Sequence, residues 1–255
     1  YDYNYHYNGY KELDILVSHF KKMIDAIKSR EKILNDSKNE LQKTLNEKVI
    51  LLQEVHHRVK NNLQIIISLI SLQESLIKDE KIITSFKDLR GRIKSMSLIH
   101  EKLYQTNDFA HIEFGDYILS IISDTKHIYS NLNIKPKFEL NIEKVYISLE
   151  NSIPLGLIVN EIVTNIYKYA FPQKREIEPT IFVEFNKISD EVTTLRIGDN
   201  GVGFPKDYNV ENSKSLGFRL ITSLSEQINA KYHLSKENGV VWSFEISERV
   251  QAKSP

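Results

Sequence analysis

Two adjacent histidines, His56 and His57, stand in a stretch whose helical periodicity gives them different surroundings. At 3.6 residues per turn, His56 lies beside the apolar row that holds Leu52 and Val59, whereas His57 points almost away from that row. We therefore expect His57 to face solvent. An exposed neutral imidazole keeps a ring nitrogen lone pair that can attack phosphorus.

The neighbours of His57 suit such a reaction. Glu54, three residues earlier on the same face, could hold or deprotonate the other ring nitrogen, and Lys60 and Asn61 could meet the oxygens of a transferred phosphoryl group. Taken alone, this segment is equally compatible with an ordinary surface histidine among solvated neighbours. A second group of residues makes the chemical interpretation stronger.

That second group begins on a helix expected to open near Pro154, with Glu161, Asn165, Lys168 and Tyr169 spaced to share one side. An asparagine amide oxygen can bind Mg²⁺, a hard cation that keeps several waters and bridges to substrate phosphates. Lys168, one turn later, would supply positive charge to those phosphates.

Downstream, Asp199, Gly201 and Gly203 follow an apolar run directly, in the sequence LRIGDNGVGFP. An aspartate at a strand end can accept a hydrogen bond from an exocyclic amine, and glycines allow the backbone to turn close to a ligand. Gly217 then starts an amphipathic helix, whose first backbone amides suit phosphate. Each element alone is commonly a turn or surface decoration, but their order and spacing together predict a nucleotide site.

The first part of the chain must carry His57 on a long helix. Apolar residues recur every seven positions, and the stretch from 11 to 90 contains neither proline nor glycine. The seam of this repeat is formed by Leu13, Phe20, Ile27, Leu34, Leu41 and Val55 in one row and by Val17, Ile24, Leu45, Leu52 and Val59 in the other. The pattern favours a parallel two-stranded coiled coil, with a single solvated helix as the alternative.

After a polar break at 78–80, a second amphipathic stretch follows at 82–103. Two such helices form a hairpin that leaves a wide apolar stripe uncovered, so two chains would close a four-helix bundle. We therefore predict a homodimer.

Beyond residue 104, strand-like runs alternate with helices, which predicts an α+β multidomain protein that ends in a two-layer α/β sandwich with helices on one face of the sheet. The predicted strands are 137–142, 145–149, 180–186, 193–198, 231–235 and 240–246, and the predicted helices are 114–129, 153–170 and 216–228. The expected domains are a signalling coiled-coil helix at 1–48, a dimerisation and histidine phosphotransfer domain at 49–106, and a catalytic ATP-binding domain at 107–255.

Composition excludes several classes of function. The formal net charge is zero, which argues against a nucleic-acid binder, and the absence of cysteine rules out disulfides and thiolate chemistry. No run reaches the roughly 18 apolar residues that cross a bilayer. We expect a soluble, cytoplasmic fragment.

The sequence resembles the sensor histidine kinases over about residues 45–248. NEIVTNIYKYAF resembles their N box, DNGVGF their G1 box and SLGFRL their G2 box, the motifs of the Bergerat ATP-binding fold shared with gyrase-type ATPases. EVHHRVKNNLQ resembles the H box of a subgroup related to the HWE kinases. The stretch KELDILVSHFKKMIDAIKSREKIL is similar to the end of a HAMP signalling module, which implies a membrane-spanning sensor upstream.

This resemblance implies autophosphorylation of His57 by ATP with Mg²⁺, followed by transfer to an aspartate in the receiver domain of a response regulator. It implies that Asn165 binds the magnesium ion and that Asp199 accepts a hydrogen bond from the adenine amine. It also implies that Gly201, Gly203 and Gly217 form part of the nucleotide pocket and the hinge of its lid. A hinge between the domains is expected at 104–112.

Three positions depart from the family pattern. Arg58 stands where an acid commonly follows the histidine, which leaves the identity of the general base in doubt. Gly217 is the single glycine of the G2 box, and Trp242 stands where a small hydroxyl residue is common. Two alternatives therefore remain at this point, a non-catalytic ATP-binding dimeric scaffold and a Bergerat-fold ATPase or serine kinase.

Overall fold

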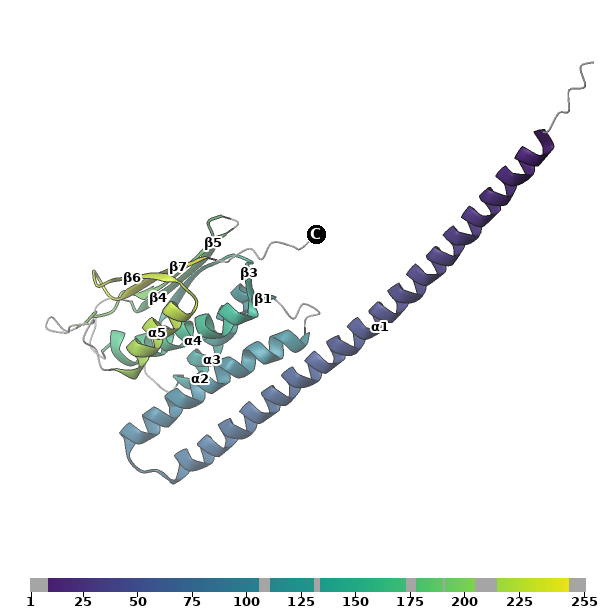
Figure 1. The fold of residues 1–255 in the computed structure, drawn as a ribbon. Helices are drawn as coiled ribbons and strands as arrows, with labels where there is room; N and C mark the ends of the chain where they lie inside the picture. The colour runs from purple at the N-terminus through teal and green to yellow at the C-terminus, as the bar shows by residue number, and fades with distance from the viewer. Residues whose placement is uncertain are drawn as a thin grey trace, which may run out of the picture. The chain divides into compact units, whose positions relative to one another are not determined.

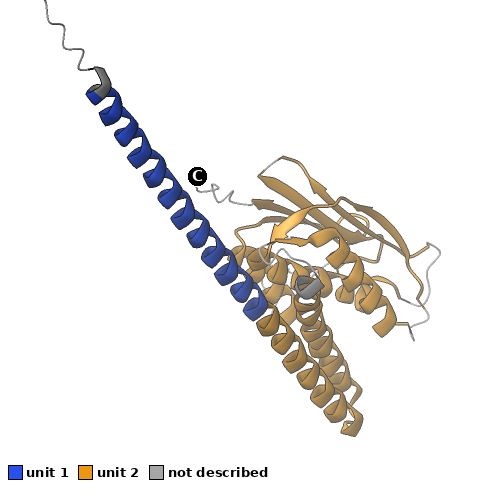
Figure 2. Ribbon diagram, turned by 90° about the vertical axis from the view of Figure 1, so that its right-hand side faces the viewer, with its two compact units in different colours: residues 1–52 blue, residues 53–255 orange. Residues whose placement is uncertain are grey.

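The computed structural model describes residues 9–105, 111–130, 134–172, 178–189, 191–204 and 215–247. They divide into two compact units, residues 1–52 and residues 53–255 (Figure 2). Among the described residues, no helix is both long enough and apolar enough to cross a membrane.

The first unit is helical, and it forms the N-terminal part of α1, which runs from Gly9 to Leu76. The predicted coiled-coil seam is exposed along this part of the single chain, with Leu34 72% exposed and Leu41 71% exposed. Large apolar side chains repeated along one helix face and left in water are typical of a helix that associates with another.

The second unit begins with a helical hairpin made by the C-terminal part of α1 and by α2, Glu80–Gln105. The predicted break between the helices is confirmed, because the Oδ1 atom of Asp79 accepts hydrogen bonds from the backbone N–H groups of Lys81 and Ile82, at 2.8 and 3.4 Å. This is the arrangement of a side chain that caps a helix N-terminus. An ion pair of 2.7 Å between Arg90 and Glu74 joins the two helices near the turn.

The remainder of this unit is a mixed α/β domain, as predicted (Figure 1). Its main sheet has the order β2-β4-β5-β7-β6, in which β2 and β4 are parallel and the other neighbours are antiparallel. The strands of this sheet are β2 Lys137–Ile142, β4 Thr180–Lys187, β5 Val192–Asp199, β6 Lys231–Ser235 and β7 Val241–Ser247.

Helices cover one face of this sheet (Figure 1). They are α3 Phe114–Ile128, α4 Leu149–Asn165 and α5 Leu216–Gln227. The domain core is apolar, and its largest fully buried side chains include Phe114, Tyr117 and Phe185 from α3 and β4. The alternating burial along β4 and β5 reflects one sheet face turned to these helices and one turned away.

Apart from shifts of one or two residues at element ends, the predicted and observed elements differ in two places. A short antiparallel pair, β1 His111–Glu113 with β3 Tyr146–Ser148, was only half predicted, since three residues of strand carry almost no periodic signal. The helix expected at 153–170 begins earlier, at Leu149, where the Ser148 hydroxyl accepts from the backbone of Asn151, and it ends in a π-helix, η1 Ile166–Ala170.

Two expectations lie wholly or partly outside the described residues. The structure gives no account of residues 106–110, which hold most of the expected hinge, or of residues 205–214 between the two glycine boxes. The predicted domain boundaries also stay predictions, since the hairpin and the α/β domain fall together in the second unit.

Candidate functional site

The two adjacent histidines of α1 have the different environments that the helical period predicts. His56 is 8% exposed, whereas His57 lies on the open face of the helix. His57 Nδ1 is 3.3 Å from Asn61 Nδ2, one turn further along. The imidazole that could act as a nucleophile is therefore the one that solvent and a partner can reach.

Glu54 shares the face of His57 but interacts mainly with Arg58. Its Oε1 atom accepts a hydrogen bond of 2.6 Å from Arg58 Nε. This hydrogen bond and the charge of Arg58 lower the pKa of the Glu54 carboxyl, with a smaller contribution from His57. Glu54 is thus held as a carboxylate beside the histidine.

His56 turns inward and meets a histidine of α2. The Nδ1 atoms of His56 and His100 lie 3.0 Å apart, and the ring centroids 5.3 Å apart. A hydrogen bond between two such nitrogens needs one of them to donate and the other to accept, so at least one ring is neutral. Burial lowers the pKa of both imidazoles, and for His100 the nearby His56 lowers it further.

Most of the residues predicted to bind a nucleotide gather around one pocket of about 680 Å³ in the α/β domain. The predicted residues that line it are Asn165, Lys168, Tyr169, Asp199, Gly203 and Gly217. They come from α4, η1, the end of β5, the residues just after it, and the start of α5. His57, Glu54 and Asn61 do not line this pocket and remain on the helix face described above.

Asp199 at the end of β5 and the glycines that follow it are tightly packed. Asp199 is 2% exposed, and its Oδ1 atom accepts a hydrogen bond of 2.6 Å from the backbone N–H of Gly201. A Cβ atom on Gly201 would lie 2.3 Å from that same oxygen and 2.6 Å from the carbonyl oxygen of Ala170. Gly203 has φ of +70°, a conformation that favours glycine. The turn thus fixes the carboxylate at the pocket wall.

The end of α4 supplies the polar wall of the pocket. Glu161 and Asn165 lie one turn apart, and the π-helical turn that follows carries Lys168 and Tyr169. Such π-helical insertions occur often at functional sites. A Cβ atom on Gly217 would lie 2.9 Å from Glu161 Oε2 and 3.5 Å from Asn165 Nδ2, so the first turn of α5 packs directly against this wall.

This wall fits a magnesium ion that arrives with a phosphate ligand. Asn165 offers a single amide oxygen, and Mg²⁺ commonly takes one or two protein oxygens while waters and substrate phosphates complete its octahedron. Among the residues that the structure describes, no cluster of three or more His, Asp or Glu side chains forms a site of the all-protein kind.

Three further lining residues, Ser85, Asp88 and Arg92, come from α2 and were not identified from the sequence. Their spacing of three and four residues places them on one helix face, and this was the available signal. Taken alone, however, such spacing is ordinary for a solvated helix. Only the packing of α2 against α4 brings them to the pocket.

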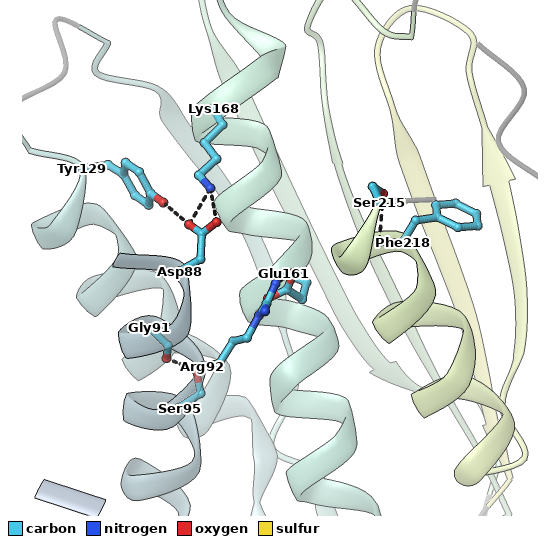
Figure 3. A network of polar contacts seen from close by, with 9 residues as sticks. All are labelled: Asp88, Gly91, Arg92, Ser95, Tyr129, Glu161, Lys168, Ser215 and Phe218. Atoms are coloured by element: carbon cyan, nitrogen blue, oxygen red, sulfur yellow. Dashed lines mark hydrogen bonds and ion pairs between the residues drawn. The ribbon is translucent and has the colours of Figure 1, made fainter. Parts of the chain in front are cut away.

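Two ion pairs connect these α2 residues with the polar wall (Figure 3). The Nε and Nη2 atoms of Arg92 donate to the two carboxylate oxygens of Glu161 at 2.6 and 2.9 Å, and Lys168 donates to the carboxylate of Asp88. The hydrogen bonds with Glu161 raise the pKa of Arg92. Tyr129 of the residues after α3 also donates to Asp88, at 3.4 Å.

The pocket lining also has an apolar part, the apolar wall, which includes Phe218, Ile221, Val240 and Trp242. The Phe218 and Trp242 rings have centroids 5.3 Å apart, and Trp242 is 4% exposed. Because Trp242 pairs with Ile197 in the neighbouring strand, two residues from Asp199, an aromatic surface lies close to the buried carboxylate. A planar, partly apolar group with an exocyclic amine fits such a surface.

Comparison with known proteins shows what this chain is similar to. Residues 54–129 match the HisKA_2 family, described as histidine kinase. The chain is 28% identical over 193 residues to blue-light-activated histidine kinase 2 of Erythrobacter litoralis, which covers 72% of this chain and 53% of that protein. It is also 28% identical over 176 residues to the sensor histidine kinase PdtaS of Mycobacterium tuberculosis, which covers 68% of this chain and 34% of that protein.

A solved structure has the same architecture. The histidine kinase domain of the Erythrobacter litoralis blue-light activated histidine kinase superimposes with a TM-score of 0.57 at 26% identity, covering 76% of this chain and 92% of that domain. The chain spans about half the length of the first curated relative and about a third of the second. By its sequence and by its fold, this chain is similar to the sensor histidine kinases, and its residues 54–129 match the HisKA_2 histidine kinase family.

Proposed function

We propose that this chain is the kinase core of a sensor histidine kinase that uses ATP and Mg²⁺ to phosphorylate His57 and passes the phosphoryl group to an aspartate of a response regulator. The observation that carries the proposal is the combination of an exposed histidine on a helical hairpin with a pocket that gathers Asn165, Lys168 and Asp199. Both features occur within one compact unit.

The reaction needs a ring nitrogen of His57 with an available lone pair. The Asn61 amide, whose nitrogen lies 3.3 Å from His57 Nδ1, can turn over so that its oxygen faces the ring; the Nδ1–H group of His57 then donates a hydrogen bond to that oxygen, and Nε2 keeps its lone pair. This nitrogen forms the new bond to the γ-phosphorus while the bond from phosphorus to the departing ADP oxygen breaks. Glu54, already ionised, then stabilises the positive charge that the imidazole acquires.

The pocket residues have separate roles in this proposal. Asp199 accepts from the adenine amine, while Gly201, Gly203 and Gly217 keep the backbone close to the nucleotide. Lys168 and Tyr169 lie at the phosphate end, and Asn165 holds the magnesium ion, which would neutralise phosphate charge. The rest of the work is positioning, since phosphoryl transfer needs little covalent chemistry from the protein.

The partners follow from the same proposal. The exposed seam of α1 and the apolar residues left exposed on the hairpin, such as Ile66 and Leu69, support a homodimer. A receiver domain of a response regulator would then collect the phosphoryl group from His57, and the cytoplasm supplies both that partner and ATP. An upstream sensor would act through α1.

Incubation of the purified chain with γ-labelled ATP and magnesium tests the proposal. We expect a label on protein that is lost in acid and retained in alkali, as phosphohistidine is. His57→Gln should abolish it, and Asn165→Ala should reduce it strongly while the circular dichroism spectrum remains unchanged. His19→Gln is the matched control, because His19 is an exposed histidine elsewhere on α1.

The same assay separates the other two classes. A non-catalytic scaffold would bind nucleotide without any label, and an ATPase or serine kinase would release phosphate or give an acid-stable product. A label that persists in His57→Gln would place the acceptor elsewhere and refute the assignment of His57.

A further inference from the structure

The pocket described above contains positive charge that is already neutralised. Of the described residues that line it, two are cations, Arg92 and Lys168, and each is paired with a carboxylate, Glu161 and Asp88 respectively (Figure 3). Asp199 adds a third carboxylate, so the described part of the lining has an excess of negative charge. Among these described residues, a polyphosphate that enters the pocket meets no cation that lacks a carboxylate partner.

The two ion pairs differ in how readily they can exchange partners. The Arg92–Glu161 pair is bidentate and its carboxylate is only 4% exposed, so separating it would leave a charge buried, whereas Asp88, the carboxylate partner of Lys168, is 22% exposed. Lys168 has a compact ammonium group that accepts any anion geometry and is held to one carboxylate, that of Asp88. A phosphate oxygen can replace that carboxylate and leave Lys168 with an anionic partner throughout.

Asp88 also keeps a donor when Lys168 leaves it. The Tyr129 hydroxyl lies 3.4 Å from Asp88 Oδ1, and the Tyr129 ring stacks on that of Tyr167 with centroids 5.4 Å apart. Burial first, and the charge of Asp88 second, raise the pKa of Tyr129, so that its hydroxyl stays protonated and able to donate. The exchange at Lys168 therefore leaves both Lys168 and Asp88 with a polar partner.

We propose that Asp88 of α2 competes with nucleotide phosphate for Lys168, so that nucleotide binding and the docking of α2 at this end of the pocket oppose each other. This inference rests on the proposed function, which makes the pocket a nucleotide site. Asp88 is then a positioning residue that acts through Lys168 and sets the affinity of the pocket. By linkage, docking of α2 weakens nucleotide binding by the same factor by which bound nucleotide weakens the docking, so a signal that loosens this contact tightens nucleotide binding.

The position of α2 gives this competition a consequence for the phosphoacceptor. The same helix contacts α1 through the His56–His100 pair and through the ion pair of 3.2 Å between Lys60 and Glu101. The α1 members of these contacts, His56 and Lys60, lie within three residues of His57 along the helix. A change in the docking of α2 is therefore sensed by the helix that carries the acceptor.

Calorimetric measurement of nucleotide binding to the full chain tests the inference. Asp88→Asn keeps the size of the side chain and removes its charge, so we expect ATP and ADP to bind about tenfold more tightly, within the range of typical coupling between sites. Adenosine, which has no phosphate, should bind with unchanged affinity. Lys168→Met should weaken ATP and ADP binding, and in that background Asp88→Asn should have no further effect.

A matched control breaks another contact of α2 with the same domain. Lys94 of α2 pairs with Asp124 of α3 at 2.8 Å, and neither residue lines the nucleotide pocket. Asp124→Asn should leave the affinity for ATP and ADP unchanged. If it tightens binding as much as Asp88→Asn does, the effect comes from general undocking of α2 and the competition for Lys168 is refuted.

The remaining outcomes also decide the matter. Unchanged or weaker ATP binding in Asp88→Asn overturns the inference while leaving the proposed function intact, provided that the wild-type chain binds ATP. Absence of nucleotide binding in both proteins overturns the proposed function itself. Should Asp88→Asn fail to fold, Asp88→Ser replaces it with the same expectation, and equal affinities of Asp88→Ser and wild type for ADP count against the competition.

Discussion

The histidines at 56 and 57 show how a single residue step along a helix separates two chemical roles. His57 faces outward, whereas His56 meets His100 across the hairpin at 3.0 Å between Nδ1 atoms. The inward hydrogen bond needs at least one neutral ring, and in the proposed reaction the outward histidine offers a ring nitrogen lone pair.

The inward pair predicts a loss of stability on mild acidification. Because the pKa of His56 and that of His100 are both lowered in the folded protein, the unfolded chain binds more protons in the pH range just below the ordinary histidine pKa of about 6.5. The contribution of the pair is therefore fully present above that pH and is lost as the pH falls below it. Urea unfolding at pH 7.5 and pH 5.5 should show this decrease.

His100→Asn is the informative variant for this prediction, because it keeps a polar group but does not titrate. Its free energy of unfolding should fall less between the two pH values than that of the wild type. Equal pH dependence in the two proteins would show that the His56–His100 pair does not contribute. His233→Asn, at an exposed histidine of β6, should behave as the wild type does.

A second prediction at the residue scale concerns the turn after β5. In Gly201→Ala the added Cβ atom would lie 2.3 Å from Asp199 Oδ1 and 2.6 Å from the oxygen of Ala170, and neither a buried carboxylate nor a backbone carbonyl can move away freely. We expect the unfolding free energy to fall by about 1–3 kcal/mol, as overpacking usually does. Nucleotide binding should weaken about tenfold or more, which corresponds to about 1.4 kcal/mol.

Gly91→Ala provides the matched control. There the added Cβ atom would be 3.8 Å from Asn160 Oδ1, an ordinary contact, and the position lies in the interior of α2. Replacing a helical glycine by alanine should raise the unfolding free energy by about 0.5–1 kcal/mol. Nucleotide binding as weak in Gly91→Ala as in Gly201→Ala would mean that the turn itself is not responsible.

At the scale of elements, α4 is the central helix of the α/β domain. It contacts α2, α3 and α5, and its last turn passes into the π-helix that carries Lys168. Gly156 allows α3 to approach α4 closely, since a Cβ atom there would lie 2.3 Å from the Tyr117 ring. The Tyr117 hydroxyl in turn donates to the backbone oxygen of Ser95 at 2.7 Å, which ties α3 to α2.

This arrangement predicts that Gly156→Ala will disturb the packing of α4 against α3 and of α3 against α2. The new methyl group must displace Tyr117 and break its hydrogen bond to α2, so we expect a loss of about 1–3 kcal/mol of unfolding free energy from overpacking alone. Tyr117→Phe, which removes only the hydroxyl, should cost about 1 kcal/mol. Thermal and urea unfolding of both variants would measure the difference, and a smaller effect for Gly156→Ala than for Tyr117→Phe would contradict this account of the packing.

The elements themselves were largely predictable because their signals are local. Strands such as Lys137–Ile142 and Lys231–Ser235 have the predicted bounds, since period-two alternation and flanking turns specify both ends. The π-helical end of α4 was not predicted, because its hydrogen-bond pattern depends on the packing of Lys168 and Tyr167 against neighbouring elements rather than on a sequence period.

At the scale of the whole molecule, the first unit needs a second chain to cover its apolar seam. Its apolar seam is exposed from Leu13 to Leu45, and a solitary helix with such a seam would be unfavourable in water. A parallel coiled coil would cover it and would bring two copies of each seam position close together.

The absence of native cysteine allows a direct test of that arrangement. In Leu41→Cys the two cysteines of a parallel dimer would face each other across the seam. Their Cα atoms would then be within the separation of about 4.4–6.8 Å that a disulfide requires. We expect rapid oxidation to a covalent dimer, seen on a non-reducing gel. Asn39→Cys, on the opposite face of the same helix, should remain largely monomeric on the gel, and equal cross-linking at both positions would argue against the parallel seam.

The sequence by itself determined the long helix, the order of the elements, the outward orientation of His57, and the residues that form the polar wall and the glycine turn. Each of these depends on periods or spacings within about twenty residues, which the chain carries locally. Only the tertiary structure decided that Asp88 and Arg92 lie at the pocket and that Lys168 and Glu161 already have partners there. These pairs join residues 69 to 80 positions apart, and contacts at such separations arise from how helices pack, which no local pattern encodes.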